Sequence, residues 1–280
     1  MPAKPNPTAR QMRLGAELRR LREAAGVTNR QAAAFLDISP TQMSHIEAGR
    51  FGIGEERLRR LAEFYACAES ELVEALVDMA SGPVQGWWRE YRTALPPKIL
   101  DLAEAEHHSS YMLCFQAMHI PGLLQTPEHM RAASLFVQPE LPEARREAHI
   151  AFRSRRQQVL DTGRPYTAVI HEAALRMRVG GPKVTRAQLE HVQAASEREN
   201  VTVLVIPFAS DFAGAGQSML YIGGTVPQLD TAQVDTAHGV VFMDSSAQLH
   251  RYRTRFERIS GTALDPVRSR DLVRTIAQEL

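Results

Sequence analysis

Apolar residues recur every three to four positions through the first eighty residues of the chain. Leu14, Leu18 and Leu21 share one face of a predicted helix, which Thr8 can cap and which Gly26 ends. The same spacing, with small polar or acidic residues ahead of the apolar positions, predicts four further short helices, at residues 29–36, 40–48, 55–67 and 69–80. The N-terminal segment is therefore predicted to be an all-α unit of five helices.

The hydrophobic pattern changes after a break at Ser81-Gly82-Pro83. Residues 95–160 are predicted to be helical, with a long charged helix over residues 140–160. Beyond them the apolar period shortens to two, or to brief apolar runs, which predict strands at residues 167–170, 201–206, 218–222 and 240–243. A predicted helix at 185–197 makes the first two strands a βαβ unit, and helices at 248–259 and 266–280 end the pattern.

Length and composition agree with two ordinary globular domains. The sequence has 280 residues, of which 44% are hydrophobic and 23% charged. It contains no apolar run of about 18 residues and no apolar segment behind its first charges, so we expect a cytoplasmic protein without a membrane span. Two cysteines, Cys67 and Cys114, are too few for a disulfide framework or a cysteine-rich zinc site. We place the domains at residues 1–80 and 86–280.

Charge is distributed unevenly along the predicted first domain. Residues 1–62 contain eleven Lys and Arg against six Asp and Glu, an excess of five positive charges, although the whole chain carries only +1. Residues 63–78 then add five acidic residues and no basic one. A local basic surface of this kind is typical of proteins that contact nucleic-acid phosphates.

The second and third predicted helices are separated by a tight turn at Asp37-Ile38. Ser39 supplies an N-cap, and Pro40 occupies the first helical position. Two short helices joined in this way place the N-terminus of the second helix in the DNA major groove. On that helix Met43 and Ile46 are expected to face inward, which leaves outward-facing polar side chains that can reach base edges, namely Thr41, Gln42, Ser44 and His45.

Residues 28–50 resemble the helix-turn-helix of the Cro and phage-repressor family, also called the xenobiotic-response-element family. The most specific part is the ending Ser44-His-Ile-Glu-Ala-Gly-Arg50. Two positions depart from the family pattern: Asp37 stands where Gly is usual, and Ala32 where a larger aliphatic residue is common. The resemblance implies a lambda-repressor-like domain whose DNA-binding residues are Arg30, Gln31, Ser39, Thr41, Gln42, Ser44, His45 and Arg50. A five-helix bundle with merely solvated polar residues, or one that serves only in assembly, is the alternative.

The rest of the chain resembles the C-terminal domain of actinobacterial regulators similar to the Scr-type antitoxin-like group. The resemblance is carried by Ile120-Pro-Gly-Leu-Leu-Gln-Thr126, by Arg153-x-Arg155-Arg156-Gln157, by His171-Glu172-x-x-Leu175-Arg176, and by Gln188-Leu189. It implies a small acidic partner protein, for which the charged helix offers Arg145, Arg153 and Arg156. Because acidic residues share that helix, a solvated face with internal ion pairs is the alternative.

Few residues indicate catalysis or metal binding. Glu104, His107 and His108 lie within one helical turn but lack a third ligand at a diagnostic spacing. His171-Glu172 stands at a predicted strand end, where a pocket role is conceivable, but no nucleophile motif accompanies it. The small-residue loop at 211–217 matches no phosphate-binding pattern. We therefore expect no catalytic residue, no metal site, no cofactor and no enzymatic activity.

The predicted fold class is a five-helix all-α N-terminal domain followed by an α+β domain, containing an α/β unit, with a small mixed sheet. The predicted function is a sequence-specific transcriptional regulator, a homodimer on palindromic double-stranded DNA whose second domain senses a partner or ligand. One alternative is an antitoxin-like factor that sequesters a small protein. Another is a ligand-binding or hydrolytic α/β domain, which a deep pocket lined by His171 and Glu172 would favour.

Overall fold

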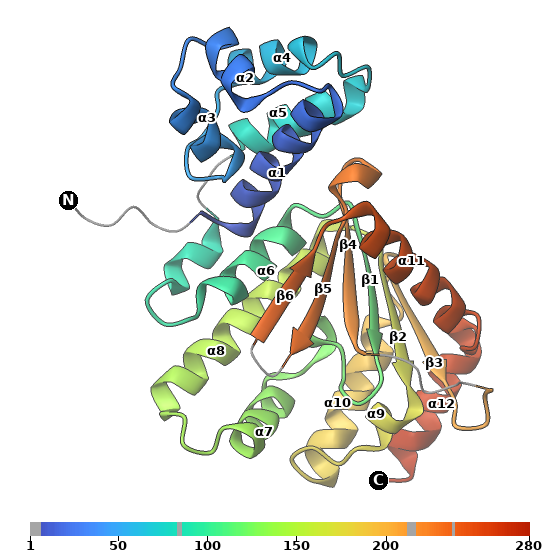
Figure 1. Cartoon of the computed structure of the whole chain (residues 1–280). Coiled ribbons are helices and arrows are strands. Elements are labelled where there is room, and N and C mark those ends of the chain that lie inside the picture. The colour runs from blue at the N-terminus through green and yellow to red at the C-terminus, as the bar shows by residue number, and fades with distance from the viewer. Residues whose placement is uncertain (1–6, 83–85, 212–216, 237–238) are drawn as a thin grey trace.

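The structure is a computed structural model that describes residues 7–82, 86–211, 217–236 and 239–280. The lead-in before residue 7, residues 83–85 of the expected domain boundary, and most of the small-residue loop at 211–217 lie outside the described residues. A helical unit stands at one end of a larger domain that is built on a single sheet (Figure 1). None of the described helices has the length and apolar character that a membrane crossing needs.

The N-terminal unit consists of five helices, as predicted. They are α1 (Ala9–Ala24), α2 (Asn29–Phe35), α3 (Pro40–Glu47), α4 (Glu55–Phe64) and α5 (Ser70–Ser81). Each of the first three begins with a capping box, in which a Ser or Thr and a Gln three residues later exchange hydrogen bonds with each other's backbone N–H. The pairs are Thr8 with Gln11, Thr28 with Gln31, and Ser39 with Gln42. Local sequence thus fixes where these helices begin.

The core of this unit is formed by inward-facing aliphatic side chains, among them Leu18, Met43 and Leu58. Helix α1 crosses α3 at backbone contact, because a Cβ atom at Gly15 would lie 2.5 Å from the carbonyl oxygen of Glu47. Val226 and Leu229, which come from the second domain, also belong to this core. The two domains therefore share buried apolar surface.

The second domain mixes helices and strands. Its helices are α6 (Pro97–His107), α7 (Pro127–Val137), α8 (Glu143–Arg156), α9 (Glu172–Arg176), α10 (Pro182–Ala195), α11 (Ser246–Ser260) and α12 (Pro266–Gln278). Short 3-10 turns, including η1 (Trp87–Tyr91), η2 (Gly122–Leu124) and η3 (Gln157–Thr162), connect them. The strands are β1 (Tyr111–Gln116), β2 (Tyr166–His171), β3 (Val201–Ile206), β4 (Met219–Gly223), β5 (Thr231–Thr236) and β6 (Gly239–Met243).

The four predicted strands are confirmed, but β1 and β5 were not predicted. The expectation that residues 95–160 are helical throughout is wrong at β1, which pairs with β2 on one side and β4 on the other. A strand that is paired on both sides and covered by apolar side chains on both faces has a sequence that is a short apolar run. Periodicity alone cannot distinguish such a run from part of a buried helix. Strand β5 is half polar, and its alternation is short.

The six strands form one mixed sheet in the order β3-β2-β1-β4-β5-β6. Strands β1, β2 and β3 are parallel, whereas β4, β5 and β6 continue the sheet as an antiparallel meander. The predicted βαβ unit is confirmed, because β2 and β3 are parallel neighbours joined through α10. Register aligns Cys114 with Ala168, and Ala168 with Val203, across the three parallel strands.

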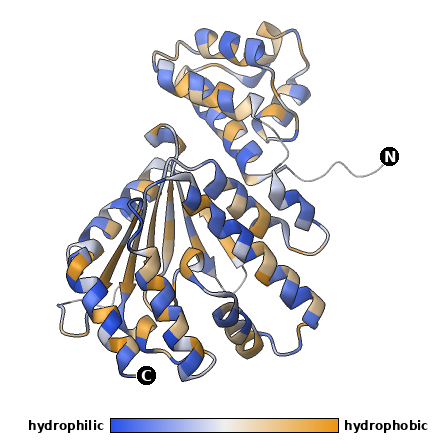
Figure 2. Ribbon diagram, turned by 180° about the vertical axis from the view of Figure 1, so that it is seen from behind, coloured by the Kyte–Doolittle hydropathy of each residue, from blue (hydrophilic) through white to orange (hydrophobic). Residues whose placement is uncertain are grey.

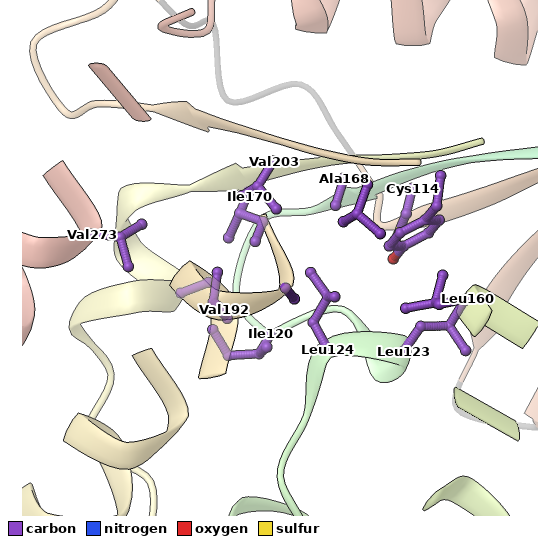
Figure 3. Close-up of a cluster of buried hydrophobic side chains, with 14 of the residues drawn as sticks. Cys114, Ile120, Leu123, Leu124, Leu160, Ala168, Ile170, Val192, Val203 and Val273 are labelled. Carbon is purple, nitrogen blue, oxygen red and sulfur yellow. The ribbon is translucent and has the colours of Figure 1, made fainter. Parts of the chain in front are cut away.

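Alternate residues of each central strand face opposite layers. One face carries Cys114, Ala168 and Val203, which pack with α10, α12 and the η2 turn in the largest core cluster (Figure 3). The other face carries Phe115 and Val169, which pack against α11. Seen from behind, the apolar strands lie beneath helices that carry many hydrophilic residues (Figure 2).

Candidate nucleic-acid interface

The turn between α2 and α3 depends on one left-handed residue. Asp37 adopts φ of +55°, so the aspartate takes the conformation for which the related helix-turn-helix proteins use glycine. Ala32 is fully buried on α2, and the small side chain permits close packing of α2 and α3. Both departures from the family pattern are therefore compatible with a helix-turn-helix.

The two faces of α3 are divided as the pattern predicts. Met43 and Ile46 are buried in the core. The predicted DNA-contacting residues are exposed, apart from His45, which is half-buried; the exposed ones are Arg30, Gln31, Ser39, Thr41, Gln42, Ser44 and Arg50. The helix consequently presents a polar face made of short side chains, bordered by two arginines that lie before and after it in the sequence.

A buried ion pair fixes α3 against α1. Arg22 donates from Nε to Oε1 of Glu47 at 2.6 Å and from Nη2 to Oε2 at 3.1 Å. Its Nη1 also donates to the carbonyl oxygen of Val27 at 2.8 Å. Because the fork is bidentate and both side chains are about nine-tenths buried, it sets the angle of the helix as well as its position. Glu47 belongs to the most specific string of the sequence, which gives that string a structural basis.

Several predicted base-reading side chains already have partners within the protein. Oε1 of Gln42 accepts from the backbone N–H of Ser39 at 3.0 Å, and Ser39 Oγ accepts from the N–H of Gln42 at 3.1 Å. Gln31 caps α2 in the same manner through Thr28. Ser44 Oγ donates to the carbonyl oxygen of Pro40 at 3.0 Å. These side chains shape the start of α3. Gln42 uses its side-chain oxygen in the cap, so its side-chain NH2 group is the part of Gln42 that can still donate to a base.

Three other residues predicted to contact DNA have no such partner within the described part of the protein. Within the described part of the chain, the side chains of Arg30, Thr41 and Arg50 form no ion pair or hydrogen bond. The ring of His45 lies 4.9 Å from that of Phe51, which orients the imidazole at the end of α3. The guanidinium donors of Arg30 and Arg50 are therefore available to a phosphate.

Comparison with protein families agrees with both halves of the structure. Residues 13–76 match the family described as a helix-turn-helix domain. Residues 99–275, more than half of the chain, match the family described as a domain of unknown function, DUF5753. The chain belongs to the DUF5753 family. Comparison with curated proteins and with solved structures finds no match. The helix-turn-helix match supports DNA binding and transcription regulation, whereas membership of the narrower Scr-type group stays a prediction.

The predicted partner-binding arginines of the DUF5753 domain do not share one surface. Arg145 is exposed. Arg156 is only 12% exposed and lies 2.7 Å from Glu106, whose side chain is buried. Arg153 donates to Oε1 of Gln125 at 2.7 Å, and its Nε is buried. The expected cationic surface is therefore not formed by Arg153 and Arg156, because this face of α8 packs toward the sheet rather than toward solvent.

The strings that carried the second resemblance come together in space. Gln157 donates to the carbonyl oxygens of Gly122 and Gln125, at 3.2 and 2.6 Å. Gln188 donates to the carbonyl oxygen of Leu124 at 2.6 Å, and its Oε1 accepts from the N–H of Thr126 at 2.8 Å. Buried glutamines thus hold the loop at residues 120–126 against α8 and α10. In the sequence, this cluster was indicated only by the strings that carry the resemblance, and no role was predicted for the glutamines.

The other candidate residues have structural roles. Burial lowers the pKa of His108 to about 4, and no group of three potential metal ligands exists among the described residues. Glu172 pairs with Arg176 at 2.6 Å and accepts from the N–H of Phe208 at 2.8 Å. His171 caps α9 by accepting from the N–H of Ala173. His171 and Glu172 line neither the cavity of about 530 Å³ between the two domains nor the cavity of about 540 Å³ within the DUF5753 domain, whereas His108 lines the first.

The DUF5753 domain contacts the helix-turn-helix unit through α1. Arg13 is buried and donates from Nη1 to the carbonyl oxygen of Asp244 at 2.8 Å, and from Nη2 to that of Gln228. Gln228 in turn donates to Glu69 at the start of α5. Together with Val226 and Leu229, these contacts attach the loop between β4 and β5, and the residue that follows β6, directly to the DNA-binding unit.

Proposed function

We propose that the chain is a sequence-specific DNA-binding transcriptional regulator that acts by binding rather than by catalysis. The observation that carries the proposal is the exposed polar face of α3, a helix that Arg22 and Glu47 hold in place. Arg30 and Arg50 border this face in the sequence, and neither forms an ion pair with another described residue. A rigid helix with short donors and acceptors is suited to base edges, and flanking arginines are suited to phosphates.

The regulator binds as a homodimer to a palindromic operator. One recognition helix covers only part of one major groove, so specificity of the usual size needs two half-sites about 34 Å apart. Sedimentation of the free protein and of its DNA complex tests this. A dimer has twice the 31.2 kDa mass of the chain, and a single copy on DNA would contradict the proposal.

The DUF5753 domain receives the signal. Support comes from the Arg13 contacts and the shared core, through which a change in the loop between β4 and β5 reaches α1 directly. An acidic protein partner also stays a prediction. Of the three arginines proposed for it, Arg145 is the exposed one, so Arg145→Glu is the variant that tests an acidic partner at this helix.

The deciding experiment measures DNA binding by matched variants. Duplexes selected by the protein from a random pool, and a scrambled duplex, are titrated with wild type, Thr41→Ala, Arg50→Ala and Arg268→Ala. Arg268 is an exposed arginine on α12 of the other domain, so its variant controls for the loss of one positive charge.

Thr41→Ala is expected to weaken the selected duplex by about 1–3 kcal/mol and the scrambled one little. Arg50→Ala should weaken both and flatten the salt dependence. Arg268→Ala should change neither. Failure to select any sequence would contradict sequence-specific binding, equal effects of Thr41→Ala on the two duplexes would remove α3 from base reading, and equal effects of Arg50→Ala and Arg268→Ala would remove Arg50 from the DNA interface.

A further inference from the structure

A cavity of about 540 Å³ lies within the DUF5753 domain, between the sheet and helices α6, α7 and α8. Its walls combine apolar side chains, which include Cys114 of β1, Leu220 of β4, Met130 of α7 and Phe152 of α8, with a similar number of polar and charged ones. Its volume falls within the range of about 300–1,000 Å³ that small-molecule sites occupy. None of the contacts proposed for DNA involves this space.

Two guanidinium groups line this cavity. Arg153 and Arg156 both face the cavity, and they converge on the η2 turn. A Cβ atom at Gly122 would lie 3.2 Å from Nη2 of Arg156 and 3.5 Å from Nη2 of Arg153. Because glycine is the residue at that position, the backbone of the turn can approach both cations closely. Burial, and next the charge of Arg156, lowers the pKa of Arg153 to about 10.

Arg156 forms an ion pair at the cavity, whereas Arg153 forms none with another described residue. Glu106 is fully buried and pairs with Arg156 at 2.7 Å. Arg153 has only a neutral hydrogen-bond partner, Oε1 of Gln125, and its buried Nε has none among the described residues. Asp235 also lines the cavity, but it is exposed to solvent and accepts a hydrogen bond from Gln233. Among the described residues Arg153 therefore has no carboxylate at hydrogen-bond distance, although the charges of Asp235 and Glu106 are near enough to raise its pKa in part.

The arginine is positioned rather than accidental. Gln125 receives its bond while donating to the carbonyl oxygen of Ile120 at 2.7 Å, and Gln157 holds the same loop through two backbone carbonyls. Gln125 and Gln157 thus hold the loop at residues 120–126 against the helix that carries Arg153. A charge taken out of water is destabilising without a partner of opposite sign, so an anionic ligand that pairs with Arg153 would offset that cost.

We propose that this cavity binds a small organic anion, with an apolar body against the sheet and an acidic group at Arg153. This proposal gives the chemical class of the signal that the DUF5753 domain would receive, and it rests on the sensing role proposed above. Binding itself is measured without DNA, so that this proposal and the DNA-binding proposal can fail separately.

The test uses a matched pair of fluorescent probes on the full chain. Anilinonaphthalene sulfonate has an apolar body and one anionic group, whereas N-phenylnaphthylamine has a similar body without the charge. We expect one anionic probe per chain. Arg153→Met should weaken its affinity about tenfold or more, the size expected for a lost charged hydrogen bond, and leave the neutral probe unchanged. Arg145→Met removes an exposed arginine of the same helix and should change neither probe.

A second variant tests the location of the probe. Ala133 lies on α7 and lines the cavity while remaining half-buried, so Ala133→Phe fills the space without replacing a core side chain. This variant should lose both probes. Loss of the neutral probe in Arg153→Met, equal loss of the anion in Arg153→Met and Arg145→Met, or undiminished binding by Ala133→Phe would each overturn the proposal, whatever the outcome with DNA.

Discussion

Substitutions of Gln42 can distinguish the contribution of this side chain to protein stability from its contribution to DNA affinity. Its Oε1 accepts the N–H of Ser39 at 3.0 Å at the start of α3, where the positive end of the helix dipole lies. Glu at this position can accept the same hydrogen bond, and Gln and Glu serve equally in capping boxes. Ala cannot accept it. Gln42→Ala should therefore lower the free energy of unfolding by about 1 kcal/mol, and Gln42→Glu should leave it nearly unchanged.

DNA affinity should respond in the opposite order. A carboxylate about 4 Å from a phosphate is repelled by about 1 kcal/mol in water and by about 4 kcal/mol at an effective dielectric constant of 20. With one phosphate in that range, Gln42→Glu should weaken a selected duplex between about fivefold and a thousandfold. The loss should shrink as salt increases. Gln42→Ala adds no charge, and at low salt it should bind more tightly than Gln42→Glu.

Urea unfolding followed by circular dichroism gives the stabilities, and fluorescence anisotropy of a labelled duplex at several salt concentrations gives the affinities. The reasoning is refuted if Gln42→Glu binds at low salt as tightly as wild type, because the start of α3 then lies away from the phosphates. It is also refuted if Gln42→Glu destabilises the protein as much as Gln42→Ala does, because the capping box then contributes nothing.

Three further outcomes are expected. Glu47→Gln removes the buried carboxylate that pairs with Arg22 and leaves only the half-exposed Glu23, 3.5 Å away, so it should lower the free energy of unfolding by about 3–5 kcal/mol in urea titrations; a loss below about 1 kcal/mol would contradict the anchoring role. Leu229→Ala should reduce hydrogen-exchange protection in α5 as well as in β5, and protection lost in β5 alone would show that the shared core is weak. Burial lowers the pKa of His129 to about 4, below its unfolded value of about 6.5, so its stabilising effect is complete above pH 6.5 and is lost as the pH falls toward 4. His129→Gln should flatten that acid decline by about 3 kcal/mol, and an unchanged pH slope in urea titrations would exclude the histidine as its source.

The helix-turn-helix could be predicted closely because its determinants are local. Caps such as Ser39, the turn residue Asp37 and the spacing of Met43 and Ile46 act within a few residues of one another. The placement of β1 could not be predicted in this way, because its burial depends on β2, β4 and helices that are distant in sequence.

The same limit applies to the arginines of α8. Arg153 and Arg156 share a helix with exposed charges, and only the position of the sheet decides that they line a cavity. Their spacing of three residues places them on neighbouring parts of the helix surface. Together with the loop at residues 120–126, that spacing was the available signal, but it indicated proximity and not burial.

Val226 and Leu229 have a consequence for the order in which the protein is made. They complete the core of a unit whose helices end near residue 81, so the nascent helix-turn-helix leaves the ribosome with part of its apolar surface uncovered. It stays in that condition until almost 150 further residues have been added. Domains usually fold from the N-terminus as synthesis proceeds, at about 5–20 residues per second. In this chain the DNA-binding unit reaches its final packing only after most of the DUF5753 domain exists, so a prematurely terminated product would carry the recognition helix on an incomplete core.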